Sequence, residues 1–288
     1  MSFSLTVPEY AKPRIRGVRV LLTNDDGIEA EGLQTLRRAL LEIPGLELAV
    51  IAPDGNRSAM ARSITTRRPL WVAQVDFGDG TSGYATDGTP VDCVRLAGLG
   101  LIDGFTADVI VSGINHGANL GDDITYSGTV AAALEGVVLG LPAIAASQQS
   151  AAREMDFRLG DRFAFEECAR FVARVVEEIQ EVPMPPGTLL NVNCPAGDAR
   201  GVAVTRLGKR IYRDQLELTD EEDDRRRYWI YGADPGFEDE EGTDMAAVAA
   251  GRIAVTPLHF DLTDTSGMDA LERRDLTRLL SPAAREVE

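Results

Sequence analysis

The chain has 288 residues, 44% of them hydrophobic and 26% charged, and a formal net charge of −17, as expected for a globular enzyme with a full hydrophobic core. A charge this negative excludes a nucleic-acid polymer as the main partner, because a protein that binds a polyanion needs a basic face. A membrane is excluded as well, since no apolar run reaches the ~18 residues that a membrane-spanning helix needs.

The first predicted element is a short buried strand at 18–22 that ends in two adjacent carboxylates, Asp25 and Asp26. Residues 1–16 before it are polar, lack the apolar region of a signal peptide, and are predicted to be a loose N-terminal extension. Neighbouring carboxylates repel each other unless a cation or a proton lies between them, which indicates a divalent-metal site. The alternative is a polar turn that caps the following helix, predicted at 29–43.

The remaining apolar runs predict alternating strands and helices up to about residue 200. Strands are predicted at 46–52, 63–75 (a strand or an extended hairpin), 84–86, 107–111, 141–146 and 189–193, and helices from 90, from 130 and over 161–179. Thr89 is the predicted N-cap and Pro90 the first residue of one helix. After 201 the apolar runs become short and are separated by acidic loops.

Three polar loops follow three of the predicted strands. The carboxyl ends of parallel strands share one edge of a sheet, so these loops are expected to converge. Their candidate ligands are Asp25 and Asp26 in the first loop, Ser58 in the second, and Asn115 and Asn119 in the third. Oxygen ligands without histidine or cysteine suit Mg²⁺, Mn²⁺ or Ca²⁺ rather than Zn²⁺.

The third loop ends in Ser127, Gly128 and Thr129, at the start of a predicted alanine-rich helix. Free N–H groups and the helix dipole favour an anion there, although serine and threonine also cap helices routinely. Beside a metal loop, the interpretation as a phosphate site is favoured. A metal next to a phosphate indicates hydrolysis of a phosphate ester, with Asp25 or Asp26 as metal ligand or as general base.

Several motifs, taken together and in this order, resemble the SurE family of survival-protein-E nucleotidases. They are residues 23–27 (TNDDG), 52–58 (APDGNRS), 88–93 (GTPVDC), 112–115 (SGIN), 128–130 (GTV), 190–195 (LNVNCP) and 254–258 (AVTPL). The resemblance covers about residues 18–263. Small departures from the family's pattern are Glu31, where proline is frequent, and Ala59, where glycine is frequent.

The resemblance implies a divalent-metal-dependent phosphatase that acts on nucleoside monophosphates, with Mg²⁺ or Mn²⁺ as the expected cation. It implies an α/β fold with a Rossmann-like, mostly parallel sheet flanked by helices, and a C-terminal β-rich arm that exchanges between subunits. The expected division is an extension at 1–16, a catalytic core at 17–200 and an oligomerisation arm at 201–288. The implied metal ligands are Asp25, Asp26, Ser58 and Asn115, and the implied phosphate-binding residues are Asn119, Ser127, Gly128 and Thr129.

Two other functions remain open on the sequence. A covalent aspartyl-phosphate phosphatase would also use a strand-end aspartate, but it needs a D-x-D spacing and a nearby lysine, and Lys12 and Lys209 are the only lysines. A non-catalytic nucleotide-binding protein is the other alternative. Three cysteines without C-x-x-C spacing predict free thiols in a reducing cytoplasm.

Four further side chains near the motifs have two interpretations each. His116 is a candidate general acid, although the resemblance does not require histidine there. Arg57 either contacts the substrate or braces its own loop. Trp71 and Tyr126 either stack on a base or belong to the core.

The C-terminal third carries an aromatic patch at 228–231 that needs a partner surface. We expect this patch to lie at a subunit contact of a homo-oligomer, a dimer or a tetramer. The alternative is that the patch folds back on the core of its own chain.

Overall fold

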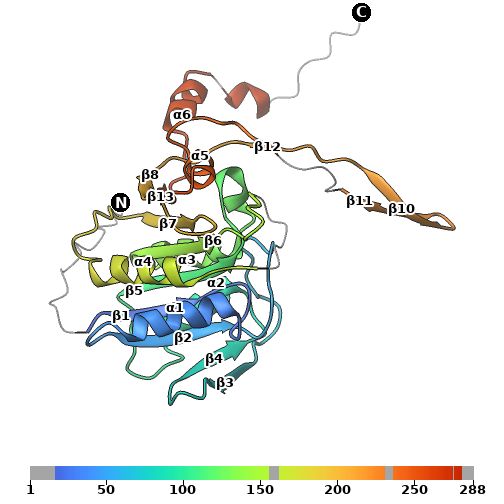
Figure 1. The fold of residues 1–288 in the computed structure, drawn as a ribbon. Helices are drawn as coiled ribbons and strands as arrows, with labels where there is room; N and C mark the ends of the chain where they lie inside the picture. Colours follow the sequence, from blue (N-terminus) through green and yellow to red (C-terminus); the bar gives the residue numbers. More distant parts are fainter. Residues whose placement is uncertain (1–16, 156–161, 231–235, 275, 281–288) are drawn as a thin grey trace, which may run out of the picture.

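A nine-stranded sheet forms the centre of the protein, in the strand order β3-β4-β2-β1-β5-β6-β7-β13-β8 (Figure 1). The structure, a computed structural model, describes residues 17–155, 162–230, 236–274 and 276–280. The strands are β1 (Arg19–Thr23), β2 (Glu47–Pro53), β3 (Val72–Asp76), β4 (Ser82–Thr86), β5 (Val109–His116), β6 (Ala143–Gln148), β7 (Thr188–Cys194), β8 (Val202–Val204), β9 (Arg210–Ile211), β10 (Glu217–Glu222), β11 (Arg225–Trp229), β12 (Gly236–Phe237) and β13 (Ile253–His259). The helices are α1 (Glu31–Leu41), α2 (Pro90–Gly98), α3 (Gly128–Val138), α4 (Glu166–Glu177), α5 (Asp244–Ala249) and α6 (Thr265–Glu272), with short 3₁₀ helices η1 (Gly121–Thr125) and η2 (Thr277–Leu280).

Strands β4, β2, β1, β5, β6 and β7 run parallel to one another. At the two sides of this group, β3 pairs antiparallel with β4 and β13 pairs antiparallel with β7. The chain leaves β1 toward β2 on one side and returns to β5 on the other side. Strand β1 therefore lies at the point where the strand order reverses, which is where ligands bind in open α/β sheets. The predicted fold class is confirmed.

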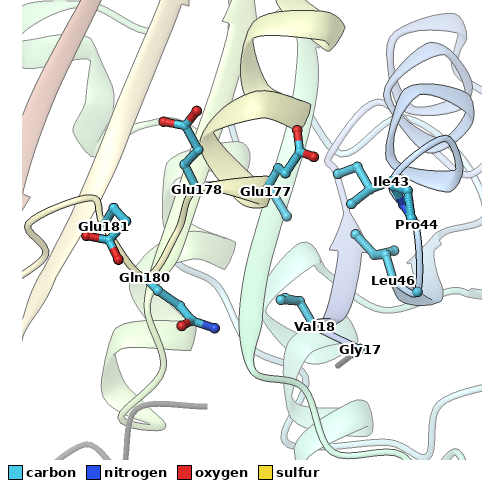
Figure 2. Close-up of a pocket in the computed structure, with 11 residues that line it drawn as sticks. Gly17, Val18, Ile43, Pro44, Leu46, Glu177, Glu178, Gln180 and Glu181 are labelled. Atoms are coloured by element: carbon cyan, nitrogen blue, oxygen red, sulfur yellow. The ribbon is translucent and has the colours of Figure 1, made fainter. Parts of the chain in front are cut away.

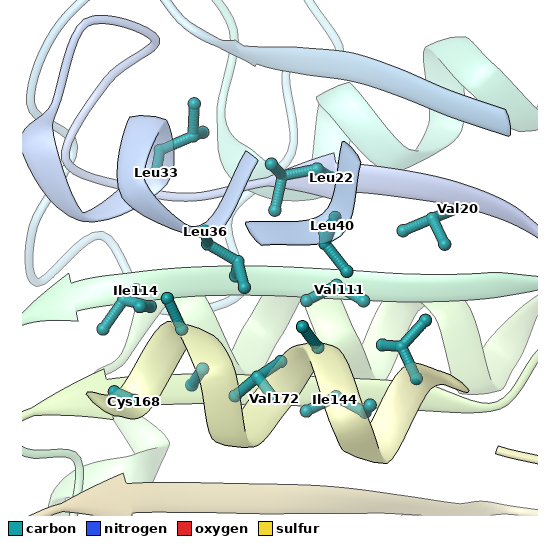
Figure 3. Close-up of a cluster of buried hydrophobic side chains, with 14 of the residues drawn as sticks. Val20, Leu22, Leu33, Leu36, Leu40, Val111, Ile114, Ile144, Cys168 and Val172 are labelled. Atoms are coloured by element: carbon teal, nitrogen blue, oxygen red, sulfur yellow. The ribbon is translucent and has the colours of Figure 1, made fainter. Parts of the chain in front are cut away.

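Helices cover both faces of the sheet, and each face has its own hydrophobic core. Helices α1 and α4 pack on one face, where Leu36 and Val172 meet Leu22 (Figure 3). Helices α2 and α3 pack on the other face, where Val94 and Ala132 belong to the same cluster as Leu21. Because alternate residues of β1 point to opposite faces, both sides of this strand are buried, as its continuous apolar run predicted.

Three predicted elements differ from the structure by several residues at one end. Strand β5 continues to His116, whereas the polar residues from Ser112 onward were predicted to form a loop. After a register shift at 112–115, Asn115 and His116 pair with β6 and stay in the strand. Helix α4 begins at Glu166 rather than at 161, and of the segment 63–75 only the end forms strand β3.

The C-terminal third contributes both to the sheet and to a projecting hairpin. Strands β8 and β13 extend the main sheet beyond β7. Strands β10 and β11 form an antiparallel hairpin that projects away from the main sheet (Figure 1). Trp229, where β11 ends at the base of this hairpin, is 64% exposed. The alternative, that the aromatic patch folds back on its own core, is therefore wrong for 228–230, which are exposed. Residue 231 lies outside the described residues.

Among the residues that the structure describes, no helix is long and apolar enough to cross a membrane. The three cysteines are free and buried, as the sequence predicted.

Candidate metal and phosphate site

The carboxylate of Asp25 is buried against the N-terminus of α3. The hydroxyl of Thr129 donates a hydrogen bond to Oδ1 of Asp25. A Cβ atom at Gly128 would lie 2.7 Å from Oδ2 of Asp25, so only glycine allows the helix to come this close. The positive end of the helix dipole faces this carboxylate and favours its negative charge.

Burial raises the pKa of Asp25 to about 6, and repulsion by Asp26 adds to this shift, while hydrogen bonds from Thr129 oppose it. Two adjacent carboxylates in such a place can both stay ionised only if a cation lies beside them. Their hard oxygen atoms fit Mg²⁺ or Mn²⁺. Among the described residues there is no group of three or more His, Cys, Asp or Glu side chains that could hold a metal. A cation beside these two carboxylates would therefore need hydroxyl or amide oxygens as further ligands.

Asp26 is held by His116, which the sequence analysis left as a candidate acid. Oδ2 of Asp26 accepts a hydrogen bond from the backbone N–H of His116 at 3.0 Å and lies 2.8 Å from its Nδ1. The ring of His116 packs edge-on against Phe163 and Phe165, with centroid distances of 5.1 and 4.8 Å. When Nδ1 donates to Asp26, Nε2 is the ring atom left to contact a ligand.

The loop that carries Ser58 is tied to Asp25 and to the segment before α3. The backbone N–H of Arg57 donates to the carbonyl of Asp25 at 2.6 Å, and that of Ala61 donates to the carbonyl of Tyr126 at 3.1 Å. The guanidinium of Arg57 pairs with Asp54 in the same loop at 2.6 Å. Of the two interpretations of Arg57, the structure supports bracing of the loop.

Asn115 completes the predicted ligand set from the end of β5. Its Nδ2 donates to the carbonyl of Gly117 at 2.8 Å, so Oδ1 is the atom left to bind a cation. The four predicted ligands lie after β1, after β2 and near the end of β5, and these strands are adjacent in the sheet. Hydrogen bonds from the second loop to Asp25 and from β5 to Asp26 connect all three segments.

The side chains predicted to bind phosphate have partners inside the protein. The hydroxyl of Ser127 accepts a hydrogen bond from the backbone N–H of Val130 at 3.1 Å and so caps α3. The amide of Asn119 donates to the hydroxyl of Ser147 at 2.8 Å. Together with the bond from Thr129 to Asp25, these contacts assign local roles to three of the four residues, and their phosphate contacts stay a prediction.

Two aromatic residues near the site are exposed. Trp71 is 82% exposed, so its assignment to the core is wrong. Tyr126 is also exposed and directly precedes the cap residue Ser127. Its ring is therefore available to a ligand at the N-terminus of α3.

The sequence analysis missed a buried ion-pair cluster behind the site. Glu135 of α3 is 1% exposed and pairs with Arg62, which follows the Ser58 loop, and with Arg95 of α2. A single glutamate in an otherwise small and apolar helix was the signal that could have indicated this cluster.

A cavity lies at the opposite, amino-terminal edge of the strands, away from these loops. It is lined by residues before β1 and β2 and by the end of α4, among them Val18, Leu46 and Glu177 (Figure 2). None of the candidate ligands lines it, so we do not assign the chemistry to this cavity.

Comparison with known proteins now identifies the family. A family model described as "Survival protein SurE" matches residues 20–214 of the chain. The chain belongs to the SurE family. Relatives named "5'-nucleotidase SurE" include one from Rubrobacter xylanophilus, which is 50% identical over 266 residues, 91% of this chain and 99% of the relative. Another, from Chloroflexus aggregans, is 45% identical over 88% of this chain and 98% of its own length.

A solved structure supports the same assignment. The crystal structure of the SurE protein from Aquifex aeolicus matches with a TM-score of 0.75 and 38% sequence identity, covering 88% of this chain and 98% of that chain. The resemblance predicted from the sequence motifs is therefore confirmed, and so is the SurE-type arrangement of the sheet.

Proposed function

We propose that this chain hydrolyses nucleoside monophosphates to nucleoside and inorganic phosphate with the help of one divalent cation, Mg²⁺ or Mn²⁺. The observation that carries the proposal is the buried carboxylate of Asp25 beside Asp26, at the strand where the sheet order reverses. Membership of a family whose relatives are named 5'-nucleotidases supports the reaction class. The proposed cation ligands are Asp25, Asp26, Ser58 and Asn115.

A divalent cation bound there supplies a Lewis acid for the phosphoryl oxygen and lowers the pKa of a coordinated water. The chain's own residues hold the ligands in place. Thr129 and the N-terminus of α3 keep the carboxylate of Asp25 oriented and charged. Asp26 fixes the ring of His116 through Nδ1, which leaves Nε2 facing away from this carboxylate.

The phosphate is proposed to lie at the N-terminus of α3, close to Gly128. The hydroxyl of Thr129 donates to Asp25, and the backbone N–H of Val130 donates to the hydroxyl of Ser127. The donors that we propose for the phosphate are therefore the backbone N–H of Gly128 and the O–H of Ser127, which only accepts in its capping bond. The exposed ring of Tyr126 offers a surface on which a nucleobase can stack.

The contacts of the two aspartates argue against a covalent aspartyl-phosphate mechanism. The nucleophile in that mechanism must be exposed to the phosphorus atom, whereas Asp25 is buried and bonded to Thr129 and Asp26 is bonded to His116. The absence of a lysine between Lys12 and Lys209 points the same way.

Phosphate release from nucleoside 5'- and 3'-monophosphates, measured with EDTA and then with added Mn²⁺ or Mg²⁺, tests the proposal. We expect no release in EDTA, recovery with the cation, and loss of activity in Asp26→Asn but not in the exposed control Asp103→Asn. Turnover that persists unchanged in EDTA would overturn the metal-dependent mechanism, and cation-stimulated binding without turnover would favour a non-catalytic nucleotide-binding protein.

We also propose that the chain forms a homo-oligomer, a dimer or a tetramer, through the arm that contains β10 and β11. The exposed indole of Trp229 on this hairpin supports it, because a large apolar group exposed on a projecting hairpin needs a partner surface. Sedimentation of the full chain should show an oligomer that Trp229→Ser weakens and Trp71→Ser, at the other exposed tryptophan, does not. A monomer at micromolar concentration would refute this.

A further inference from the structure

Glu135 is a carboxylate enclosed almost completely within the protein. It lies in α3, is 1% exposed, and has two arginine partners. Its Oε2 accepts a hydrogen bond from Nη2 of Arg62 at 2.9 Å, and its Oε1 forms an ion pair, without hydrogen-bond geometry, with Nε of Arg95 at 2.8 Å. A buried charge is tolerated only when it is paired, so these contacts hold their elements firmly together.

The two arginines come from different parts of the chain. Arg62 directly follows the loop that carries Ser58, and its guanidinium also lies 4.5 Å from the ring centroid of Phe260. Arg95 belongs to α2, which supplies none of the proposed cation ligands. Removal of either arginine leaves Glu135 with one positive partner, so the two arginines form a matched pair for comparison.

Helix α3 contacts both Asp25 and the end of the loop that carries Ser58. Its first turn holds Asp25 through Thr129, and its second half holds the end of the Ser58 loop through Glu135. At a rise of about 1.5 Å per residue, the two contacts are roughly 9 Å apart along a rigid helix. A helix that is fixed at both contacts sets the position of the loop relative to Asp25.

We propose that Glu135 and Arg62 are positioning residues, which fix the Ser58 loop against α3 and thereby place Ser58 beside Asp25. The ion pair touches no reacting atom. It acts through the loop, whose backbone N–H groups at Arg57 and Ala61 are bonded to Asp25 and Tyr126. The part of this inference that concerns cation binding rests on the proposed function.

Amide hydrogen exchange tests the positioning role without any reference to activity. In Arg62→Met, the amides of Arg57, Ser58 and Ala61 should exchange about tenfold faster or more, because the loss of a charge-assisted bond frees the loop. In the control Arg95→Met these amides should exchange as in the wild type. Arg62→Lys keeps the charge and should restore much of the protection. Equal acceleration in both methionine variants, or in neither, would overturn the inference.

Calorimetric titration with Mn²⁺ tests the consequence for the site. The affinity for Mn²⁺ should fall about tenfold in Arg62→Met and change little in Arg95→Met. Ser58→Ala should add little to Arg62→Met, because two substitutions that remove the same cation contact are not additive. Fully additive losses would show that Arg62 does not act through Ser58 and would overturn the inference. If the wild type binds no Mn²⁺ while the exchange pattern is as expected, the proposed metal site fails and the positioning of the loop stands.

Discussion

Replacement of Asp25 by asparagine should abolish hydrolysis and, at the same time, make the metal-free protein more stable above pH 6. Asparagine has nearly the same shape, and its Oδ1 can still accept the hydrogen bond from Thr129. What the substitution removes is a negative charge that is buried next to a second carboxylate, Asp26. Without a cation, that charge opposes folding.

The size of the effect follows from the pKa of Asp25, which burial and Asp26 raise from an ordinary 3.8 to about 6. Because the pKa in the folded state is the higher one, the folded protein holds a proton between about pH 4 and 6 that the unfolded chain has lost. The free energy of unfolding is therefore highest at low pH and falls as the pH rises through this range. At about 1.4 kcal/mol per pKa unit, the fall amounts to about 3 kcal/mol.

Urea unfolding at pH 5 and pH 8 in EDTA measures this difference. Wild type and the exposed control Asp103→Asn should both lose stability between the two pH values. Asp25→Asn should lose about 1.4 kcal/mol less, because roughly half of the total fall of about 3 kcal/mol lies below pH 5. Added Mn²⁺ should stabilise the wild type at pH 8 and have no effect on Asp25→Asn. A variant that is less stable than the wild type at pH 8 in EDTA, or that Mn²⁺ still stabilises, would refute the reasoning.

Three other substitutions test the surroundings of the site. Thr129→Val deletes a hydrogen bond to a buried carboxylate, and such a bond contributes about 1.5–3 kcal/mol. The affinity for Mn²⁺ should therefore fall by about 10- to 100-fold, and Thr129→Ser should restore it. Unchanged Mn²⁺ affinity with weaker inhibition by phosphate would show that the hydroxyl contacts the substrate instead. Gly128→Ala puts a Cβ 2.7 Å from Oδ2 of Asp25 and should reduce turnover with little change in the far-UV circular dichroism spectrum. Full activity would show that α3 can move away from Asp25 without loss of function. Ala59→Gly relieves a left-handed backbone at φ 57° and should raise the free energy of unfolding by about 0.5–1 kcal/mol in urea titrations; a loss of stability would contradict this.

The position of Ala59 shows how a departure from a family pattern acquires a physical meaning. From the sequence alone, position 59 differs from the family pattern only in having alanine where glycine is frequent. The structure gives Ala59 a backbone conformation that glycine adopts without strain and alanine does not. The backbone strain at Ala59 is confined to the loop that carries Ser58.

Local patterns of the sequence were enough to predict most strands and helices of the sheet and the polar loops that meet at one edge of it. The apolar run before Asp25 determines a strand that is buried on both faces, and Thr89 with Pro90 determines where α2 begins. Both features could be predicted because the spacing of apolar residues and helix capping involve only residues close together in the sequence. The polar residues that follow successive strands were expected at one edge of the sheet, because the carboxyl ends of parallel strands lie at the same edge. The boundary of β5 could not be predicted, because its polar end is held in the strand by pairing with β6.

Only the tertiary structure decided which side chains touch one another in the site. The bonds from Thr129 to Asp25, from His116 to Asp26 and from Arg62 to Glu135 join residues that are 104, 90 and 73 positions apart. Such contacts depend on the order of the strands and on the faces that the helices cover. No local pattern carries this information, because the same strands and helices in another order would bring different side chains together. The sequence therefore determined the chemistry available to this protein, and the packing of α3 on β5 and β6, which brings Thr129 to Asp25, decided how those side chains are held in place.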